Sequence, residues 1–280
     1  MTLLGEAPLL RALVAGFLHR DAGRGEALLA DGAIVGTPEV GPLHAIAYRS
    51  SAGLVIPVAV AQRLDPADAD ACLTALAPTG PLVLLGAEDH VGSLVTAAYV
   101  SHTVAFDLVQ QVMERDGALQ ANATASSPLH LRLAHPADLE HVVRLVADHQ
   151  HEELGLEVDR SLSGGLARRL RDRIARRWCV LGFLGGEPVT HVAASVCSPE
   201  GAQLEAIYTV PSARGHGYAA TALQSLTGEL AEQGARRFSL VVAPGNEAAC
   251  RLYTRLGLTI RGRVRFVRLV PRGAGPTRTG

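Results

Sequence analysis

A short turn, residues Arg214 to Ala219, holds the residue types that best suit ligand binding. Gly215 and Gly217 lack a Cβ, so the backbone can curl there and approach a ligand closely. Apolar residues recur at helical spacing behind the turn, at Ala219, Leu223, Leu226 and Leu230. A helix therefore begins inside the turn, and its unpaired N–H groups and dipole favour a phosphate or pyrophosphate. The two glycines alone are equally compatible with a purely structural turn.

Two neighbouring segments make the functional interpretation of the turn more specific. Before it, residues Tyr208 to Pro211 end a predicted strand, and after it, residues Asn246 to Leu258 form a predicted helix. Together with the turn, they resemble the acyl-CoA signature of the GNAT (Gcn5-related N-acetyltransferase) superfamily. The superfamily's Arg/Gln-x-x-Gly-x-Gly/Ala pattern is matched by Arg214, Gly217 and Ala219. This resemblance implies a fourth strand that splays from its neighbour before the turn.

The resemblance also implies a set of cofactor-binding residues. They hold acetyl-CoA, or another acyl-CoA, through the turn amides and the main chain of the splayed strand. By this analogy the set is Ile207, Thr209, Arg214, Gly215, His216, Gly217, Tyr218, Ala219 and Asn246. His216 is also compatible with a solvated position in the turn, and Asn246 with a helix N-cap that contacts the cofactor.

Two residues are candidates for the proton transfers of acyl transfer. Tyr253 matches the family position whose hydroxyl lies near the thioester sulfur and acts as general acid, although its ring could simply pack against the sheet. Glu205 shares strand parity with Ile207 and Thr209, so we expect all three to face the same side of the sheet. The family often uses a glutamate on this strand as the base, and the alternative is a structural or solvent-facing Glu205.

A polar cluster ends the first helix of the C-terminal half, at His149, His151, Glu152 and Glu153. His149 and His151 would point apart on a helix, and no distant ligand set is evident, so we expect no metal site. A solvated helix end is the simplest interpretation. Alternatively, Glu152, Glu153 and Glu157 attract a cationic amine, since this region shapes the acceptor site in GNAT proteins.

Composition excludes several other classes of protein. With 48% hydrophobic and 19% charged residues among 280, the chain can build a core, and its pI near 6.8 indicates neither a nucleic acid nor a membrane partner. All 26 basic residues are arginine, which removes a P-loop lysine and a lysine Schiff base. The four cysteines are widely spaced, and no apolar run reaches the roughly 18 residues of a membrane span. We expect a cytoplasmic protein.

The N-terminal half alternates predicted helices and strands. A helix is expected over residues 1–20, a hairpin over 43–48 and 54–60, helices over 65–76 and 88–99, and strands over 81–86 and 102–113. This pattern predicts a small α/β domain over residues 1–116, followed by a small, polar linker over 117–128. The role of the domain over residues 1–116 is unknown, and this domain weakly resembles a degenerate GNAT half.

The C-terminal half has the order of elements of the GNAT fold. Residues 129–270 are predicted to form β-α-α-β-β-β-α-β-α-β, an α+β fold with a mixed central sheet, and residues 271–280 a loose tail. The last strand, over 264–270, offers an edge by which a homodimer could form.

The resemblance implies an N-acetyltransferase that works by direct attack of an amine on the thioester, without a metal. The acceptor is a small-molecule or peptide amine that the sequence does not identify. One alternative is a catalytically silent acyl-CoA sensor or scaffold. Another places the main function in residues 1–116, with the acyltransferase unit as regulator.

Overall fold

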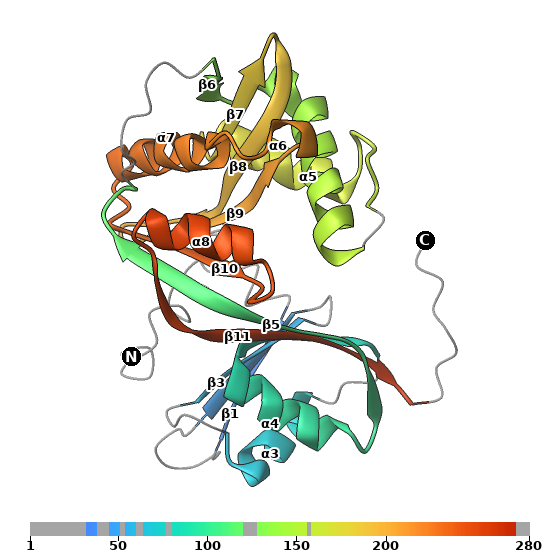
Figure 1. Ribbon diagram of the computed structural model, residues 1–280. Coiled ribbons are helices and arrows are strands. Elements are labelled where there is room, and N and C mark those ends of the chain that lie inside the picture. The colour runs from blue at the N-terminus through green and yellow to red at the C-terminus, as the bar shows by residue number, and fades with distance from the viewer. Residues whose placement is uncertain are drawn as a thin grey trace. The chain divides into compact units, whose positions relative to one another are not determined.

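The computed structural model describes residues 32–37, 45–50, 54–59, 64–76, 80–119, 128–155 and 158–272. Its contacts divide the chain into two compact units (Figure 1). Unit 1 consists of Met1–Val112, Val241–Asn246 and Ile260–Gly280, and unit 2 of Met113–Leu240 and Glu247–Thr259. The helix predicted over residues 1–20, most of the predicted linker and nearly all of the predicted tail lie outside the described residues.

Unit 1 is built on strands in the order β1-β2-β3-β4-β11-β5. Its elements are β1 Gly32–Thr37, β2 Ala45–Ser50, β3 Leu54–Ala59, α3 Pro66–Leu76, β4 Leu82–Ala87, α4 Glu88–Ala98, β5 His102–Asp116 and β11 Thr259–Pro271, the last two of which continue into unit 2. The predicted hairpin is confirmed as β2 and β3, which pair antiparallel. Strand β1 was not predicted, because its six residues begin with glycine and show no clear alternation.

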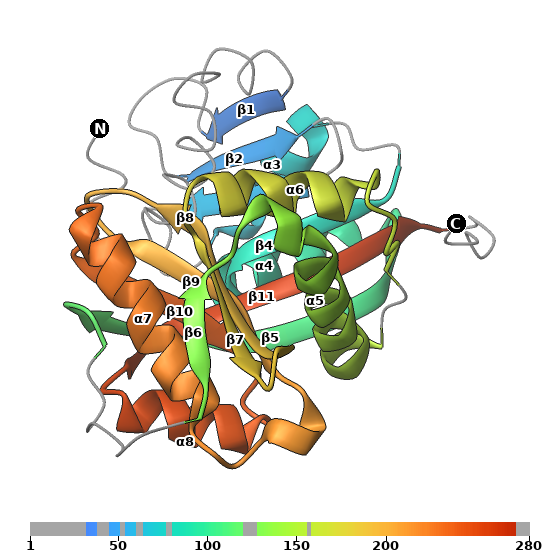
Figure 2. The same ribbon diagram turned by 90° about the horizontal axis from the view of Figure 1, so that it is seen from above.

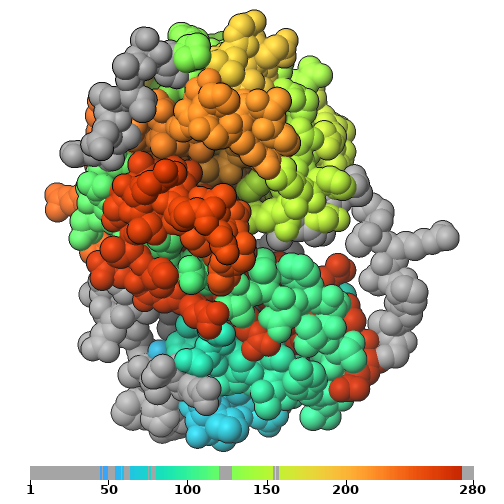
Figure 3. All heavy atoms as spheres, in the orientation of Figure 1, coloured from blue at the N-terminus to red at the C-terminus, as the bar shows by residue number. Residues whose placement is uncertain are grey.

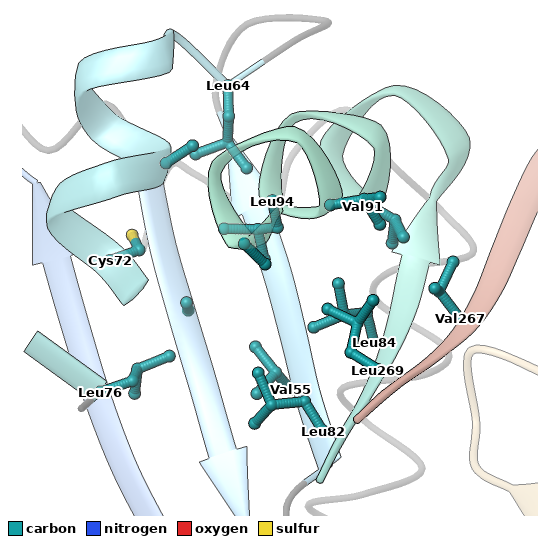
Figure 4. Close-up of a cluster of buried hydrophobic side chains, with 14 of the residues drawn as sticks. Val55, Leu64, Cys72, Leu76, Leu82, Leu84, Val91, Leu94, Val267 and Leu269 are labelled. Carbon is teal, nitrogen blue, oxygen red and sulfur yellow. The ribbon is translucent and has the colours of Figure 1, made fainter. Parts of the chain in front are cut away.

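The core of unit 1 lies between its sheet and the helices α3 and α4 (Figure 4). Leu82 and Leu84 of β4 alternate with less buried residues and are fully buried. Val91 and Leu94 of α4 pack in the same cluster. So does Val267 of β11, which is fully buried although it comes from the far end of the chain.

Strand β11 changes the predicted division of the chain. It pairs antiparallel with β4, from Val264 opposite Ala87 to Leu269 opposite Leu82. The edge that we expected to be exposed over residues 264–270 is therefore occupied by β4 on this side. The structure also differs from consecutive domains over 1–116 and 129–270, because its unit 1 takes this strand from the C-terminal end.

Unit 2 is built on strands in the order β10-β9-β8-β7-β6. Its elements are β6 His130–Leu133, η1 Pro136–Asp138, α5 Leu139–Leu154, α6 Gly165–Ala175, β7 Cys179–Leu184, β8 Glu187–Cys197, β9 Ala202–Thr209, η2 Pro211–Ala213, α7 Tyr218–Glu232, β10 Arg237–Val242 and α8 Glu247–Arg255. Neighbouring strands from β6 to β9 pair antiparallel, whereas β9 and β10 pair parallel. The mixed sheet and the order of elements confirm the predicted fold class.

The helices of unit 2 cover both faces of its sheet, with α5 and α6 on one face and α7 on the other (Figures 1 and 2). Cys179, Leu181 and Phe183 alternate along β7 and join the cluster that α5 and α6 cover. Helix α7 buries the predicted stripe that includes Leu223 and Leu226. The strands between these layers carry the candidate site.

Candidate active site

Strands β9 and β10 are paired only where they begin. Phe238 lies opposite Ala202 and Ser239 opposite Gln203, and the described ladder ends there, although β9 continues to Thr209. Unpaired main-chain N–H and C=O groups at a strand edge can bind an extended ligand as an added strand would. The remaining length of β9 therefore offers a backbone edge beside the glycine turn.

A β-bulge interrupts β9 at Ala206. His191 of β8 pairs with Tyr208, and Ala193 with Glu205, so two steps along β8 correspond to three along β9. Ala206 takes up the extra residue with a left-handed φ of 51°, which is unusual for a residue other than glycine.

Because of the bulge, the predicted orientation of Glu205 is wrong. Because one extra residue lies between them, Glu205 and Thr209 do not share a face of the sheet. Glu205 lies opposite Ala193, which belongs to the cluster under α5 and α6, and its carboxylate forms an ion pair with Arg173 of α6. The Arg173 guanidinium is almost wholly buried, so Glu205 is the counter-ion of a buried charge.

The glycine turn has the backbone geometry that its sequence predicts. Gly215 and Gly217 have φ angles of 82° and 79°, and Gly217 is the N-cap of α7. A residue with a side chain would be strained at either position. The turn is exposed from Arg214 to Gly217, and Figure 3 shows atoms of this part of the chain, in orange, at the surface of the unit. The first N–H groups of α7 have no partner within the helix, as at any helix start.

Arg214 ties the turn to β9 and α5. Its Nε donates a hydrogen bond of 2.9 Å to the Thr209 carbonyl, and its Nη2 lies 2.7 Å from the Glu152 carboxylate. The guanidinium also lies over the Tyr208 ring, 5.5 Å from its centroid. The hydrogen bond from Arg214 lowers the pKa of Glu152. The structure thus brings together Thr209 and Arg214, which the sequence analysis singled out as cofactor ligands.

The other predicted side chains have separate surroundings. His216 stacks on the Tyr218 ring at 5.4 Å between centroids, so it is not merely solvated. Tyr253 of α8 is buried, and burial, with a smaller effect of Glu153 and Cys250, raises the pKa of its hydroxyl. Asn246 directly precedes α8, and its N–H donates to the Ala243 carbonyl at 2.9 Å.

The polar cluster at the end of α5 is held by internal pairs. His149 lies 3.0 Å from the Glu153 carboxylate and its ring is 5.7 Å from that of Tyr208. Within the described part of the chain, no three His, Cys, Asp or Glu side chains are grouped to hold a metal ion. Likewise, no helix that the structure describes is long and apolar enough to cross a bilayer.

Sequence reasoning missed two residues beside the β9 bulge. Arg173 was one of several arginines in its helix, and no pattern distinguishes it from the others. His191 was part of a largely apolar strand, where an ionisable residue between Val189 and Val192 could have attracted attention. The structure shows that both are buried next to β9.

A family comparison identifies this arrangement. Residues 143–258, which contain the bulged strand, the glycine turn and α8, match the model of the acetyltransferase (GNAT) family. This part of the chain is a GNAT acetyltransferase domain. The predicted resemblance is confirmed for this part of the chain, which is an N-acetyltransferase domain of a family whose members use acetyl-CoA.

Solved structures show that the likeness in fold extends beyond the GNAT domain. A GCN5-related N-acetyltransferase from Kribbella flavida has a TM-score of 0.62 and 17% identity, covering 97% of each chain. One from Sphaerobacter thermophilus has a TM-score of 0.61 and 17% identity, covering 98% of this chain and 96% of its own. A Drosophila protein has a TM-score of 0.68 and 13% identity, and the match covers 94% of this chain and 90% of the Drosophila chain. A search of curated proteins finds no match.

Proposed function

We propose that the GNAT domain transfers the acetyl group of acetyl-CoA directly to the nitrogen of an amine. The observation that carries this proposal is the strand β9, which leaves β10 after two residue pairs and leads into a two-glycine turn at the start of α7. A strand edge followed by a helix N-terminus suits a ligand with an amide-rich arm and a pyrophosphate.

The proposed binding mode uses main-chain groups more than side chains. The pantetheine arm pairs with the edge of β9 at Ile207 and Thr209, and the amides of residues Gly215 to Ala219 hold the pyrophosphate. The Thr209 carbonyl already accepts a hydrogen bond from Arg214, so Arg214 fixes the strand end rather than competing for the phosphate. Asn246, at the start of α8, is proposed as a further contact of the cofactor.

In the proposed reaction, the amine nitrogen bonds to the thioester carbonyl carbon while the C–S bond breaks. Glu205 takes the proton that the amine loses, directly or through water, and Tyr253 gives a proton to the departing thiolate. The Tyr253 hydroxyl is protonated at neutral pH, as a proton donor requires, because the ordinary pKa of tyrosine is about 10 and burial raises it further. The oxygen charge that develops is stabilised by the backbone N–H groups of β9.

The test is isothermal titration with acetyl-CoA of the parent protein and of Gly217→Glu. The substitution adds a negative charge where the pyrophosphate would lie, so we expect affinity to fall at least about tenfold, which corresponds to about 1.4 kcal/mol. Gly186→Glu is the matched control. Gly186 also has a left-handed φ, 88°, with open space around it, but it lies in the turn between β7 and β8.

Three outcomes are informative. Binding by the parent and by Gly186→Glu, with loss in Gly217→Glu, supports the cofactor site, and thiol release with a panel of small-molecule and peptide amines then identifies the acceptor class. Binding without turnover of any amine would favour the acyl-CoA sensor. No binding by the parent would contradict the proposal.

A further inference from the structure

His191 is a fully buried histidine that touches the bulge of β9. It lies on β8 opposite Tyr208, and its Nδ1 is 2.9 Å from the carbonyl oxygen of Ala206. A carbonyl oxygen can only accept, so Nδ1 must carry the proton of this hydrogen bond. His191 therefore donates to the backbone of the residue that forms the bulge.

Ala206 needs such a partner. A residue other than glycine is strained in the left-handed region, and a carbonyl turned out of the ladder loses its strand partner. A buried carbonyl without a hydrogen bond would destabilise this conformation further. The hydrogen bond from His191 offsets part of this cost and favours the bulged form of the strand.

The residue next to His191 supports the other side of the bulge. The Thr190 hydroxyl, also fully buried, lies 2.9 Å from the Tyr208 carbonyl and 2.8 Å from the Thr209 hydroxyl. Neighbouring side chains of β8 thus hold β9 on both sides of Ile207. This is the segment whose free edge is the proposed site of the acyl-CoA arm.

The imidazole acts here as a neutral donor. The pKa of His191 is lowered to about 4, chiefly by burial and with smaller effects of Arg173 and His149 in the same direction, although the hydrogen bond to Ala206 acts to raise it. Its Nε2 is buried and has no hydrogen-bond partner among the described residues, so the bond to Ala206 is the polar contact that orients the ring.

From these contacts we infer that His191 is a positioning residue, which holds the bulge at Ala206 and thereby sets the edge of β9 for acyl-CoA. The second part rests on the proposed function, whereas the first part does not. A strand without the bulge would turn every residue beyond Ala206 to the other face. Ile207 and Thr209 would then no longer present to acyl-CoA the main-chain groups that the proposed binding mode uses.

The test compares two substitutions of the same residue. In His191→Asn, the side-chain amide can place an N–H donor close to the position of Nδ1. His191→Leu removes the donor and keeps an apolar side chain of similar bulk. Hydrogen–deuterium exchange of a peptide over residues 202–210 reports on the bulge without any ligand. We expect exchange at least about tenfold faster in His191→Leu, since losing a hydrogen bond of about 1.4 kcal/mol has this effect, and near-parent exchange in His191→Asn.

Steady-state kinetics then test the link to the cofactor. We expect His191→Leu to raise KM for acetyl-CoA about tenfold with little change in kcat, and His191→Asn to restore it. His102→Leu is the control, because His102 is also buried and its Nε2 lies 3.2 Å from the Gly80 carbonyl, but it belongs to unit 1. It should lower stability and leave KM unchanged.

Several results would overturn the inference. Parent-like exchange in His191→Leu, or equally fast exchange in both variants, would show that His191 does not hold the bulge. Equal losses of kcat in both, at unchanged KM, would indicate a proton-transfer role instead. If the parent neither binds nor turns over acetyl-CoA, the proposed function fails, and exchange alone decides whether His191 holds the bulge. If His191→Leu does not fold, His191→Gln replaces it, because its amide nitrogen corresponds to the position of Nε2 rather than that of Nδ1.

Discussion

Tyr253 combines a buried ring with the hydroxyl that we propose as the proton donor. Only 5% of the residue is exposed, so its ring packs as a core residue does. The two roles are compatible, because a phenol that is shielded from water keeps its proton and can present it to a ligand that enters beside it. Packing and chemistry can be separated by removing only the oxygen.

For Tyr253→Phe we expect kcat to fall about 100-fold, which is within the usual contribution of general acid catalysis, while KM for acetyl-CoA changes little. The ring is retained, so the melting temperature should stay near that of the parent. Thiol release at saturating substrates measures the change. Unchanged turnover would show that the proposed acid is wrong, although the class of enzyme would stand.

Among the elements, β9 shows how far the sequence could predict this site. The strand, the glycine turn and the helix after it were all predicted, because each follows from local patterns of apolar residues and glycines. The bulge was not, since Ala206 has no local signal for a left-handed conformation and the register depends on β8. The predicted orientation of Glu205 was therefore wrong.

Glu205 and Arg173 join β9 to α6, and their pair allows the base to be tested. Glu205→Ala should leave the buried guanidinium of Arg173 without its counter-ion. Breaking a buried pair in this way costs up to about 3–5 kcal/mol, and about 1–2 kcal/mol is expected here because Glu205 is partly exposed. The denaturant midpoint measures this loss.

The double variant Arg173→Met with Glu205→Ala separates the structural role from the chemical one. It removes both charges, so we expect it to regain most of the stability that Glu205→Ala loses. If Glu205 is the base, kcat should stay low in the double variant. Recovery of kcat together with stability would mean that Glu205 acts only as a counter-ion.

At the scale of the whole molecule, the two units are not consecutive segments of the chain. Unit 1 includes Ile260–Gly280, and β11 completes its core with Val267 and Leu269. The sequence analysis placed this strand in the C-terminal domain because the order of elements fitted there. Strand partners far apart in the chain leave no local pattern, so its pairing with β4 could not be predicted.

We therefore expect a fragment of residues 126–280 to fold poorly on its own. It contains β11 but lacks β4, so Val267 and Leu269 lose the core that buries them. We expect aggregation in size-exclusion chromatography, and rescue when residues 1–125 are co-expressed as a second chain. A monomeric, fully active fragment would contradict this expectation.

The place of β11 in the chain also sets an order of events during synthesis. Strand β4 leaves the ribosome long before β11, which is translated after every other described element. Until then, the edge of β4 that β11 later covers has no partner, and Leu82 and Leu84 lie beside an unfinished core. The first unit to emerge is thus the last to be completed, and until β11 is made that edge of β4 is open to pairing with other chains.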